Sequence, residues 1–173
     1  RHANGKPSAA SSRSGACPDT TMDLILWRHA DAVDGQPDLA RPLTEKGRKQ
    51  ARAMALWLQP RLPEDLRILV SPALRAQETA RALLREFETH DAIAVGQPAS
   101  AILVASGWPD AAQAVLIIGH QPTLGEIASQ LLSGRTAAWH LAKGAVWWIR
   151  NRKRDDEIEI VLRLAITPDL VPR

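Results

Sequence analysis

Short apolar runs alternate with longer amphipathic segments along most of the chain. Three of the runs are DLILW (23–27), LRILVS (66–71) and AVLIIG (114–119), each too short for a typical helix. Runs of this kind are typical of strands that are buried on both faces of a parallel sheet. Two later segments, AVWWIR (145–150) and EIEIVLRLAI (157–166), predict a closing pair of strands. The second of them alternates in part, so one of its faces is expected to meet solvent.

The segments between the runs predict helices. One helix begins at Thr44, a favourable N-cap residue, and ends at Pro60, because proline interrupts helical hydrogen bonding. A second helix follows the second run, with Ser71 as its N-cap and Pro72 at its first helical position. Its apolar face is expected to contain Ala76, Ala80, Leu83, Leu84 and Phe87.

The remaining segments complete an alternating order of strands and helices. They predict a short strand around 92–95, a short helix around 99–106 and a helix over 123–132 that Gly134 ends. Residues 34–42 have the composition of a loop. This order indicates a three-layer α/β/α sandwich on a mainly parallel sheet, in which the last two strands can be antiparallel.

Composition predicts one globular domain preceded by a tail. The chain has 173 residues, an ordinary size for a single domain, which is expected over residues 22–173. Residues 1–21 are rich in Ser, Ala, Gly and Pro without periodicity, which is typical of disorder. Because Met22 directly precedes the first run, the tail is expected to lie upstream of the native start.

Charge and cysteine usage argue against several classes of protein. The net charge is +3, but the tail residues Arg1, Lys6, Arg13 and Asp19 together supply +2 of it, so the domain is nearly neutral. A nearly neutral domain does not favour nucleic-acid binding. No apolar run reaches the roughly 18–20 residues that span a membrane. The single cysteine, Cys17, excludes an internal disulfide and is typical of a reducing, cytoplasmic setting.

Polar side chains suited to phosphate follow three of the predicted strands. Arg28 and His29 end the first strand, Ser71 and Arg75 follow the second, and His120 follows the third. Ligands of parallel α/β sheets bind at the carboxyl ends of the strands, so these side chains are expected to converge. Arginine binds phosphate oxygens in pairs. A neutral imidazole is a nucleophile toward phosphorus, and a second, protonated imidazole can stabilise the transferring group.

Such a site requires neither a metal nor a cofactor. The sequence contains no HExxH, no CxxC and no dense carboxylate cluster, so no metal site is expected. Asp23 stands six residues after Cys17, where a cysteine phosphatase of the C-x5-R type needs arginine. His2, His90 and His140 are interpreted as surface or structural residues, and most of the tryptophans as packing groups.

Four segments in order resemble the motifs of one family, the histidine phosphatase superfamily with its phosphoglycerate-mutase-like fold. LILWRHADA (24–32) resembles its Arg-His-Gly signature, and RPLTEKGRKQA (41–51) resembles the helix start that follows it. LVSPALRAQETA (69–80) resembles the block with the second phosphate arginine, and VLIIGHQPTL (115–124) the block with the second histidine. The likeness is greatest to the small SixA-type phosphohistidine phosphatases, which share the short layout without a cap domain.

The resemblance implies a role for each candidate site residue. Arg28 and Arg75 are expected to clamp phosphate, and His29 is expected to become phosphorylated. His120 is its expected partner in the pocket. Arg41 matches a family arginine and is a candidate for phosphate or substrate contact.

Two departures from the family pattern bear on the chemistry. Ala30 replaces the signature glycine, which is tolerable only where the backbone avoids positive φ. Related phosphatases that cleave alkyl phosphates use a carboxylic acid before the second histidine, but residues 92–107 contain no Asp or Glu. Glu88, Asp91 and Asp110 only flank this gap. Because imidazole can leave phosphorus without a strong acid whereas an alkoxide leaves poorly, the gap favours phosphohistidine as the substrate.

The sequence therefore predicts a metal-free phosphatase that hydrolyses phosphohistidine on a protein through a phosphohistidine enzyme intermediate. The expected partner is a phosphorylated protein of the histidine-phosphotransfer type, which would place this monomeric chain in signalling. Two alternatives remain, a small-molecule phosphomonoesterase or mutase of the same fold and a non-catalytic phosphate-binding module. The lack of a long insertion disfavours the first, and the intact His29 disfavours the second.

Overall fold

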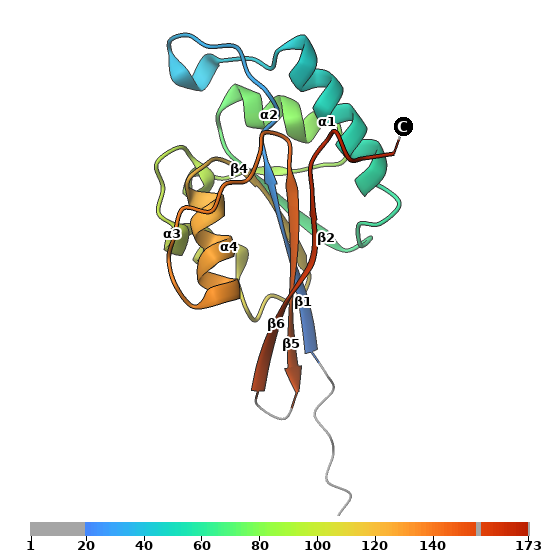
Figure 1. Cartoon of the computed structure of the whole chain (residues 1–173), viewed down its shortest axis with the longest axis vertical. Helices are drawn as coiled ribbons and strands as arrows, with labels where there is room; N and C mark the ends of the chain where they lie inside the picture. Colours follow the sequence, from blue (N-terminus) through green and yellow to red (C-terminus); the bar gives the residue numbers. More distant parts are fainter. Residues whose placement is uncertain (1–19, 155–156, 173) are drawn as a thin grey trace, which may run out of the picture.

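A mixed six-stranded sheet forms the centre of the computed structural model, which describes residues 20–154 and 157–172. The strand order is β3-β2-β4-β1-β5-β6 (Figure 1). The pairs β1–β4, β2–β4 and β2–β3 are parallel. β5 is antiparallel to β6, as predicted, and it is also antiparallel to β1. The strands are β1 (Thr20–Arg28), β2 (Leu66–Val70), β3 (Glu88–Thr89), β4 (Ala114–Gly119), β5 (Val146–Arg154) and β6 (Glu157–Ile166).

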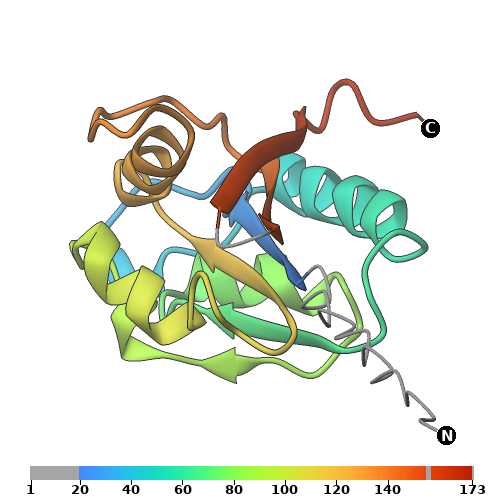
Figure 2. The same ribbon diagram turned by 90° about the horizontal axis from the view of Figure 1, so that it is seen from below.

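Helices cover both faces of the sheet. Two of them, α1 and α2, share one apolar core with the sheet, and α3 and α4 share a second core on the opposite face (Figure 2). The predicted three-layer α/β/α sandwich is therefore confirmed, without a cap domain in the described part of the chain. The helices are α1 (Glu45–Leu58), α2 (Leu74–Arg81), α3 (Ala99–Ser106) and α4 (Thr123–Ser133).

Strand β1 illustrates why the central strands show no polar alternation. Ile25 and Trp27 belong to the core beneath α1 and α2. Leu24 and Leu26 belong to the core beneath α3 and α4, and all four side chains are fully buried. Because helices cover both faces, each of these positions is apolar until the strand reaches the edge of the sheet at Arg28.

Capping geometry agrees with two predicted helix boundaries. Thr44 caps α1, since its Oγ1 accepts a hydrogen bond from the N–H of Gly47 at 2.9 Å. Gly134 ends α4 in the left-handed conformation with a φ of 70°. Gly47 is also required by packing, because a Cβ atom there would collide with the backbone oxygen of Asp31. This close approach holds the loop after β1 against the start of α1.

The second predicted helix is wrong at both ends. α2 begins at Leu74, after an N-cap at Ala73, and ends at Arg81. Leu84 then adopts a φ of 52° and is 87% exposed, so it does not belong to a buried helical face. Phe87 packs against the core from outside the helix. The helix ends early because the chain turns at Leu84 toward the edge strand β3.

The strand predicted around 92–95 is also wrong. The edge strand β3 precedes this segment, and residues Asp91–Ile93 form a single 3₁₀ turn, η2. His90 caps the turn, since its Nδ1 accepts a hydrogen bond from the N–H of Ala92 at 3.1 Å. Ile93 is buried from within this turn. A locally capped turn therefore replaces the strand that the apolar residues indicated.

The sheet extends beyond the hydrophobic runs at one end. β1 begins at Thr20, before the expected domain start at Met22, because it pairs with β5 as far as Lys153. β5 itself continues to Arg154, past its predicted end. The expected disorder of the tail falls on residues 1–19, which lie outside the described residues. Within the described residues, no helix is long and apolar enough to cross a membrane.

Candidate active site

The carboxyl edge of the sheet brings four predicted site residues together. Arg28 ends β1 and His29 follows it, His120 follows β4, and Arg75 lies in the first turn of α2. The ring centroids of His29 and His120 are 5.1 Å apart. The exposed fractions of His29, Arg75 and His120 are 7%, 4% and 5%. Two imidazoles and two guanidinium groups thus meet at one largely buried position.

The hydrogen bond of His29 determines which ring nitrogen is free. Nδ1 lies 2.8 Å from the carbonyl oxygen of Ala30. Because a carbonyl only accepts, Nδ1 carries the proton and Nε2 keeps its lone pair. Burial, together with the positive charges of Arg75 and Arg28, lowers the pKa of His29 to about 4. The ring is therefore neutral at pH 7, the state that a nucleophile toward phosphorus requires.

A serine hydroxyl holds the second histidine. Nε2 of His120 lies 2.7 Å from Oγ of Ser71, and the same Oγ accepts a hydrogen bond from the N–H of Ala73 at 3.2 Å. The sequence predicted Ser71 as the N-cap of the second helix, but Ala73 occupies that position. The Ser71 side chain instead orients His120. Its motif position was recognised, whereas this contact was missed.

His120 is neutral in the protein without phosphate. Burial, followed by the nearby His29 and Arg75, lowers the pKa of His120 to about 3. The protonated second imidazole that the sequence suggested concerns the state with a transferring phosphoryl group, and for that state it stays a prediction. An entering phosphoryl dianion would favour the protonated form, since an opposite charge raises the pKa of imidazole.

The two clamp arginines are anchored by different parts of the chain. Nη1 of Arg28 donates to the carbonyl oxygen of Leu141 at 2.6 Å. Nη1 of Arg75 donates to the carbonyl oxygen of Asp38 at 2.7 Å, and its Nη2 donates to the Asp38 carboxylate at 3.0 Å. In both side chains Nε is buried without a hydrogen-bond partner. The terminal nitrogens thus hold each guanidinium in place, while its Nε–H remains available to donate a hydrogen bond to a ligand.

Unpartnered polar atoms concentrate at this edge. Among the described residues, the buried side-chain nitrogen and oxygen atoms without a partner are Arg28 Nε, Arg75 Nε, His120 Nδ1 and Trp148 Nε1. Three of these four atoms belong to predicted site residues. Buried polar groups are normally hydrogen-bonded, so a cluster of exceptions indicates a place built for a polar ligand.

Asp38 is a charged member of the site that the sequence analysis missed. Its carboxylate accepts from Arg75 and, at 2.9 Å, from Nη1 of Arg41. Hydrogen bonds from Arg41 and Arg75 lower its pKa, so the group is ionised. The residue lies in the short turn η1 (Asp38–Ala40), inside the segment that the sequence marked only as loop. The spacing of Asp38 and Arg41 was the one local signal available.

Arg41, predicted to contact phosphate or substrate, makes its contacts within its own loop. Its Nε donates to the carbonyl oxygen of Val33 at 2.7 Å. Its two terminal nitrogens donate to the carboxylates of Asp38 and Asp34, at 2.9 and 3.3 Å. No hydrogen bond joins Arg41 to either site histidine in the part of the chain that the structure describes.

The flanking acids and the replaced glycine behave as the sequence implied. Glu88 pairs with Arg67 at 3.0 Å, and none of Glu88, Asp91 and Asp110 forms a hydrogen bond or ion pair with a described site residue. Ala30 is fully buried without a positive φ, and its N–H donates to Oγ1 of Thr79 at 3.1 Å. The extra methyl group is therefore tolerated at the end of β1.

The other described histidines, His90 and His140, are not part of the site formed by His29 and His120. His90 caps η2, and His140 is exposed. His2 lies outside the described residues. Across those residues, no group of three or more His, Cys, Asp and Glu side chains is arranged to hold a metal ion.

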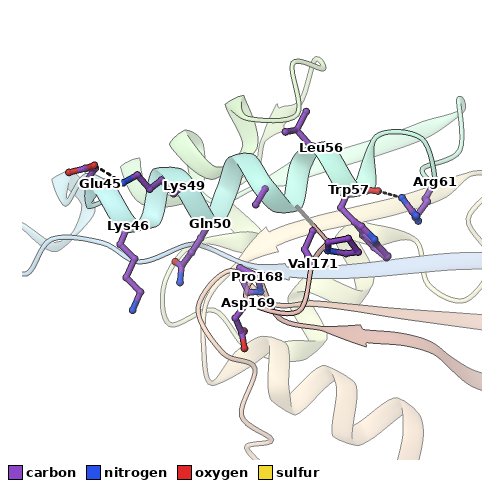
Figure 3. A pocket seen from close by; sticks show the side chains of 12 residues that line it. Glu45, Lys46, Lys49, Gln50, Leu56, Trp57, Arg61, Pro168, Asp169 and Val171 are labelled. Atoms are coloured by element: carbon purple, nitrogen blue, oxygen red, sulfur yellow. Dashed lines mark hydrogen bonds and ion pairs between the residues drawn. The ribbon is translucent and has the colours of Figure 1, made fainter.

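An open groove of about 1230 Å³ runs along α1. Figure 3 shows its lining, in which Gln50 and Trp57 of α1 point toward the C-terminal segment that carries Pro168 and Val171, whereas Leu56 points away from it. A smaller hollow of about 380 Å³ is lined by Arg28, Lys46 and Lys143, among others. Lys46, Gln50, Pro168 and Asp169 line both. The groove therefore continues into a hollow that ends at a predicted site arginine.

Comparisons with known proteins agree with this geometry. The model of the histidine phosphatase superfamily (branch 1) matches residues 24–94. Phosphohistidine phosphatase SixA of Escherichia coli is 32% identical over 124 residues, covering 66% of this chain and 77% of the relative. A SixA homologue of Haemophilus influenzae is 35% identical over 130 residues, covering 66% and 79%.

A solved structure extends the likeness to nearly the whole described fold. The protein histidine phosphatase SixA complexed with tungstate superposes with a TM-score of 0.68 and 26% identity, covering 86% of this chain and 98% of the other. The fold, the paired histidines at the sheet edge and these relatives lead to the same conclusion: the chain belongs to the histidine phosphatase superfamily and is similar to its SixA-type phosphatases.

Proposed function

We propose that this phosphatase removes phosphoryl groups from phosphohistidine on a protein, with His29 as the transient carrier. One observation carries the proposal: His29, whose Nε2 lone pair is free, lies 5.1 Å from His120 between ring centroids, and Arg28 Nε, Arg75 Nε and His120 Nδ1 are buried at the same edge without partners. Guanidinium N–H groups bind phosphate oxygens, and a neutral imidazole attacks phosphorus. The tungstate bound by the SixA structure supports an oxyanion as the ligand of this arrangement.

The first step transfers the phosphoryl group between two imidazoles. Nε2 of His29 forms a bond to phosphorus while the bond from phosphorus to the substrate ring nitrogen breaks. The electron pair of the broken bond stays on the substrate ring, which leaves as neutral imidazole when its other nitrogen carries a proton. His29 keeps its proton on Nδ1 and becomes phosphoimidazolium. Donor and acceptor are alike, so this step needs no strong protein acid.

The second step returns His29 to its starting state. Water attacks phosphorus, the bond to Nε2 breaks, and its electron pair returns to the ring, which again carries a single proton on Nδ1. The product is dihydrogen phosphate, which retains both protons of the water molecule. Arg28 and Arg75 would hold the oxygens in both steps and stabilise the charge that develops on them.

The ionised state of Asp38 supports the preference for phosphohistidine. This carboxylate pairs with Arg75, and its lowered pKa makes it a poor proton donor at neutral pH. An alkoxide leaving group requires such a donor, and losing a general acid costs on the order of 10²–10⁴ in rate. Serine and sugar phosphates are therefore expected to be poor substrates, with aryl phosphates between them and phosphohistidine.

A protein is the expected carrier of the phosphohistidine because the surface beside Arg28 is open. The groove along α1 and the hollow lined by Arg28 offer a continuous area for contact outside the reacting centre. Arg28, Lys46 and Lys143 line the hollow together with Asp31 and Asp169. Lys143 is paired with Asp31 at 2.7 Å, so an acidic partner surface around the phosphohistidine would meet chiefly Lys46 and Arg28.

The experiment compares kcat/KM for a phosphorylated histidine-carrier protein, an aryl phosphate and a sugar phosphate. The expected order places the phosphoprotein first and the sugar phosphate last, by at least about 10²-fold. Comparable values for the phosphoprotein and the sugar phosphate would contradict the proposal and favour the small-molecule phosphomonoesterase. Loss of turnover with all three, with tungstate binding intact, would favour the non-catalytic module.

A further inference from the structure

We infer that Asp38 and Arg41 form a tether that positions Arg75, and that Arg41 serves the site through this tether rather than by contacting phosphate. The inference rests on the proposed phosphate site and assigns a role to the loop between β1 and α1. It changes the role that the sequence gave to Arg41 and adds Asp38 as a positioning residue.

The first step of the inference concerns the two edges of the Arg75 guanidinium. Both terminal nitrogens are engaged by Asp38, Nη1 by its carbonyl oxygen at 2.7 Å and Nη2 by its carboxylate at 3.0 Å. Nε is buried and has no partner. A guanidinium can bind an oxyanion either through its two terminal nitrogens or through Nε and one terminal nitrogen. Since Asp38 takes the terminal edge, the Nε edge is the one left for phosphate.

The second step concerns what holds Asp38. Its other carboxylate oxygen accepts from Nη1 of Arg41 at 2.9 Å. Arg41 is itself fixed by the carbonyl oxygen of Val33 at 2.7 Å, and its second terminal nitrogen donates to Asp34. All three guanidinium nitrogens of Arg41 are therefore occupied by groups of its own loop, and its contact with the site runs through Asp38.

The third step concerns charge. A buried arginine that must both hold phosphate and keep one orientation needs a fixed counter-ion, because its long side chain otherwise has several rotamers. The Arg75 side chain is only 5% exposed, whereas that of Asp38 is 41% exposed. Asp38 thus reaches from the surface loop into the buried site and supplies this counter-ion without entering the Nε edge.

A double-mutant cycle tests the tether. The variants are Asp38→Ala, Arg41→Ala and the double variant, and each is measured for kcat/KM on the phosphoprotein and for the dissociation constant of tungstate. Each single variant is expected to lose about tenfold in kcat/KM. The kcat/KM of the double variant should be no more than about twofold lower than that of the less active single variant. Leu39→Ala is the matched control, because Leu39 is 53% exposed on the same turn η1 and takes no part in the tether, and it should stay within about twofold of the wild type.

Additive losses in the double variant would overturn the inference, because they would mean that Arg41 acts on phosphate independently of Asp38. Tighter tungstate binding by Asp38→Ala would also overturn it, because Asp38 would then compete with phosphate for Arg75. The Arg75 Nε–H resonance supplies a readout that general loosening of the fold does not mimic. It should broaden in Asp38→Ala and Arg41→Ala while the thermal midpoint stays within a few degrees of the wild type.

The tungstate measurement keeps this inference separate from the proposed function. If the wild type binds tungstate and the cycle is non-additive, the tether stands even when phosphohistidine proves to be a poor substrate. If the wild type shows no tungstate binding, the phosphate site itself is contradicted, and the tether with it.

Discussion

The arginine side chains at the two ends of the central sheet differ in how completely they are hydrogen-bonded. Near the start of β1, the carboxylate of Asp23 accepts hydrogen bonds from Nε and Nη2 of Arg150, at 2.7 and 2.6 Å. Nη1 of Arg163 lies 3.6 Å from the same carboxylate. At the carboxyl edge, Arg28 and Arg75 keep a buried Nε without a partner. A carboxylate that saturates a guanidinium fork stabilises the fold, whereas an unsaturated fork is available to a ligand. The completeness of hydrogen bonding therefore distinguishes an arginine that stabilises the fold from one that is available to bind a ligand.

Among the variants that test this comparison, Arg75→Lys is expected to cause the largest loss of kcat/KM. Lysine keeps the charge but has no planar fork, so Arg75→Lys should lower kcat/KM by more than about tenfold, a transition-state loss above about 1.4 kcal/mol. Steady-state kinetics on the phosphoprotein, with tungstate titration, measure it. Arg150→Lys is the matched control and should leave kcat/KM unchanged. Equal kcat/KM of Arg75→Lys and Arg150→Lys would show that hydrogen-bond pairing does not distinguish binding arginines from structural ones.

Removing the charge of Asp23 should have the converse effect. Asp23→Asn leaves Arg150 and Arg163 without their carboxylate, so the free energy of unfolding should fall by about 1–3 kcal/mol, at the lower end because Arg150 is 35% exposed at its side chain. Chemical denaturation measures the loss. Activity per folded molecule should be unchanged, and a large drop in kcat would contradict the structural assignment.

The neutral histidine pair predicts a pH dependence. The folded-state pKa values of about 4 for His29 and about 3 for His120 lie below the ordinary value of 6.5. Between these values the unfolded chain binds more protons, so the free energy of unfolding should fall as the pH drops below about 6.5. Above that pH the pair contributes no pH dependence. Denaturation at pH 7.5 and 5.0 measures the slope, which should be shallower in His29→Asn and His120→Asn.

Imidazole NMR resonances check the same pair directly. Neither site ring should show a protonation midpoint near 6.5 in the phosphate-free protein. A midpoint near 6.5 for His29 would mean that burial does not keep the nucleophile neutral.

The smallest expected effect concerns the surface between the site and the groove. Lys46 lines both the groove along α1 and the smaller hollow that Arg28 also lines. Neither His29 nor His120 lines these two cavities. Lys46→Glu should raise KM for the phosphoprotein several-fold and leave kcat/KM on an aryl phosphate within about twofold. An equal change with both substrates would indicate a disturbed site rather than a docking surface.

The sequence was informative where a residue's role depends on its own segment. The apolar runs placed His29 and His120 at strand ends, because a strand buried on both faces must stop where its polar residues begin. Thr44 was identified as a cap because its partner, Gly47, lies three residues away. The four ordered motifs then brought Arg28 and Arg75 into the same site.

The sequence failed where a contact crosses between segments. Asp38 binds Arg75 across 37 positions of the chain, and its spacing from Arg41 was the one local signal that marked it. Ser71 resembled a helix cap, and only the packing of β4 beside β2 brings His120 to its hydroxyl. The strand predicted around 92–95 failed for a different, local reason, because the side chain of His90 caps a 3₁₀ turn there.

Trapping the phosphoenzyme tests the central claim most directly. After mixing with a phosphorylated histidine-carrier protein and rapid quenching in base, the wild type should carry phosphate on Nε2 of His29. The label should be stable in base and lost in acid, as a phosphoramidate is. His29→Ala should carry none, whereas Leu39→Ala, a change at an exposed residue of the nearby turn η1, should label as the wild type does. A label that persists in His29→Ala, or one that survives acid, would contradict the assignment of His29 as the phosphoryl carrier.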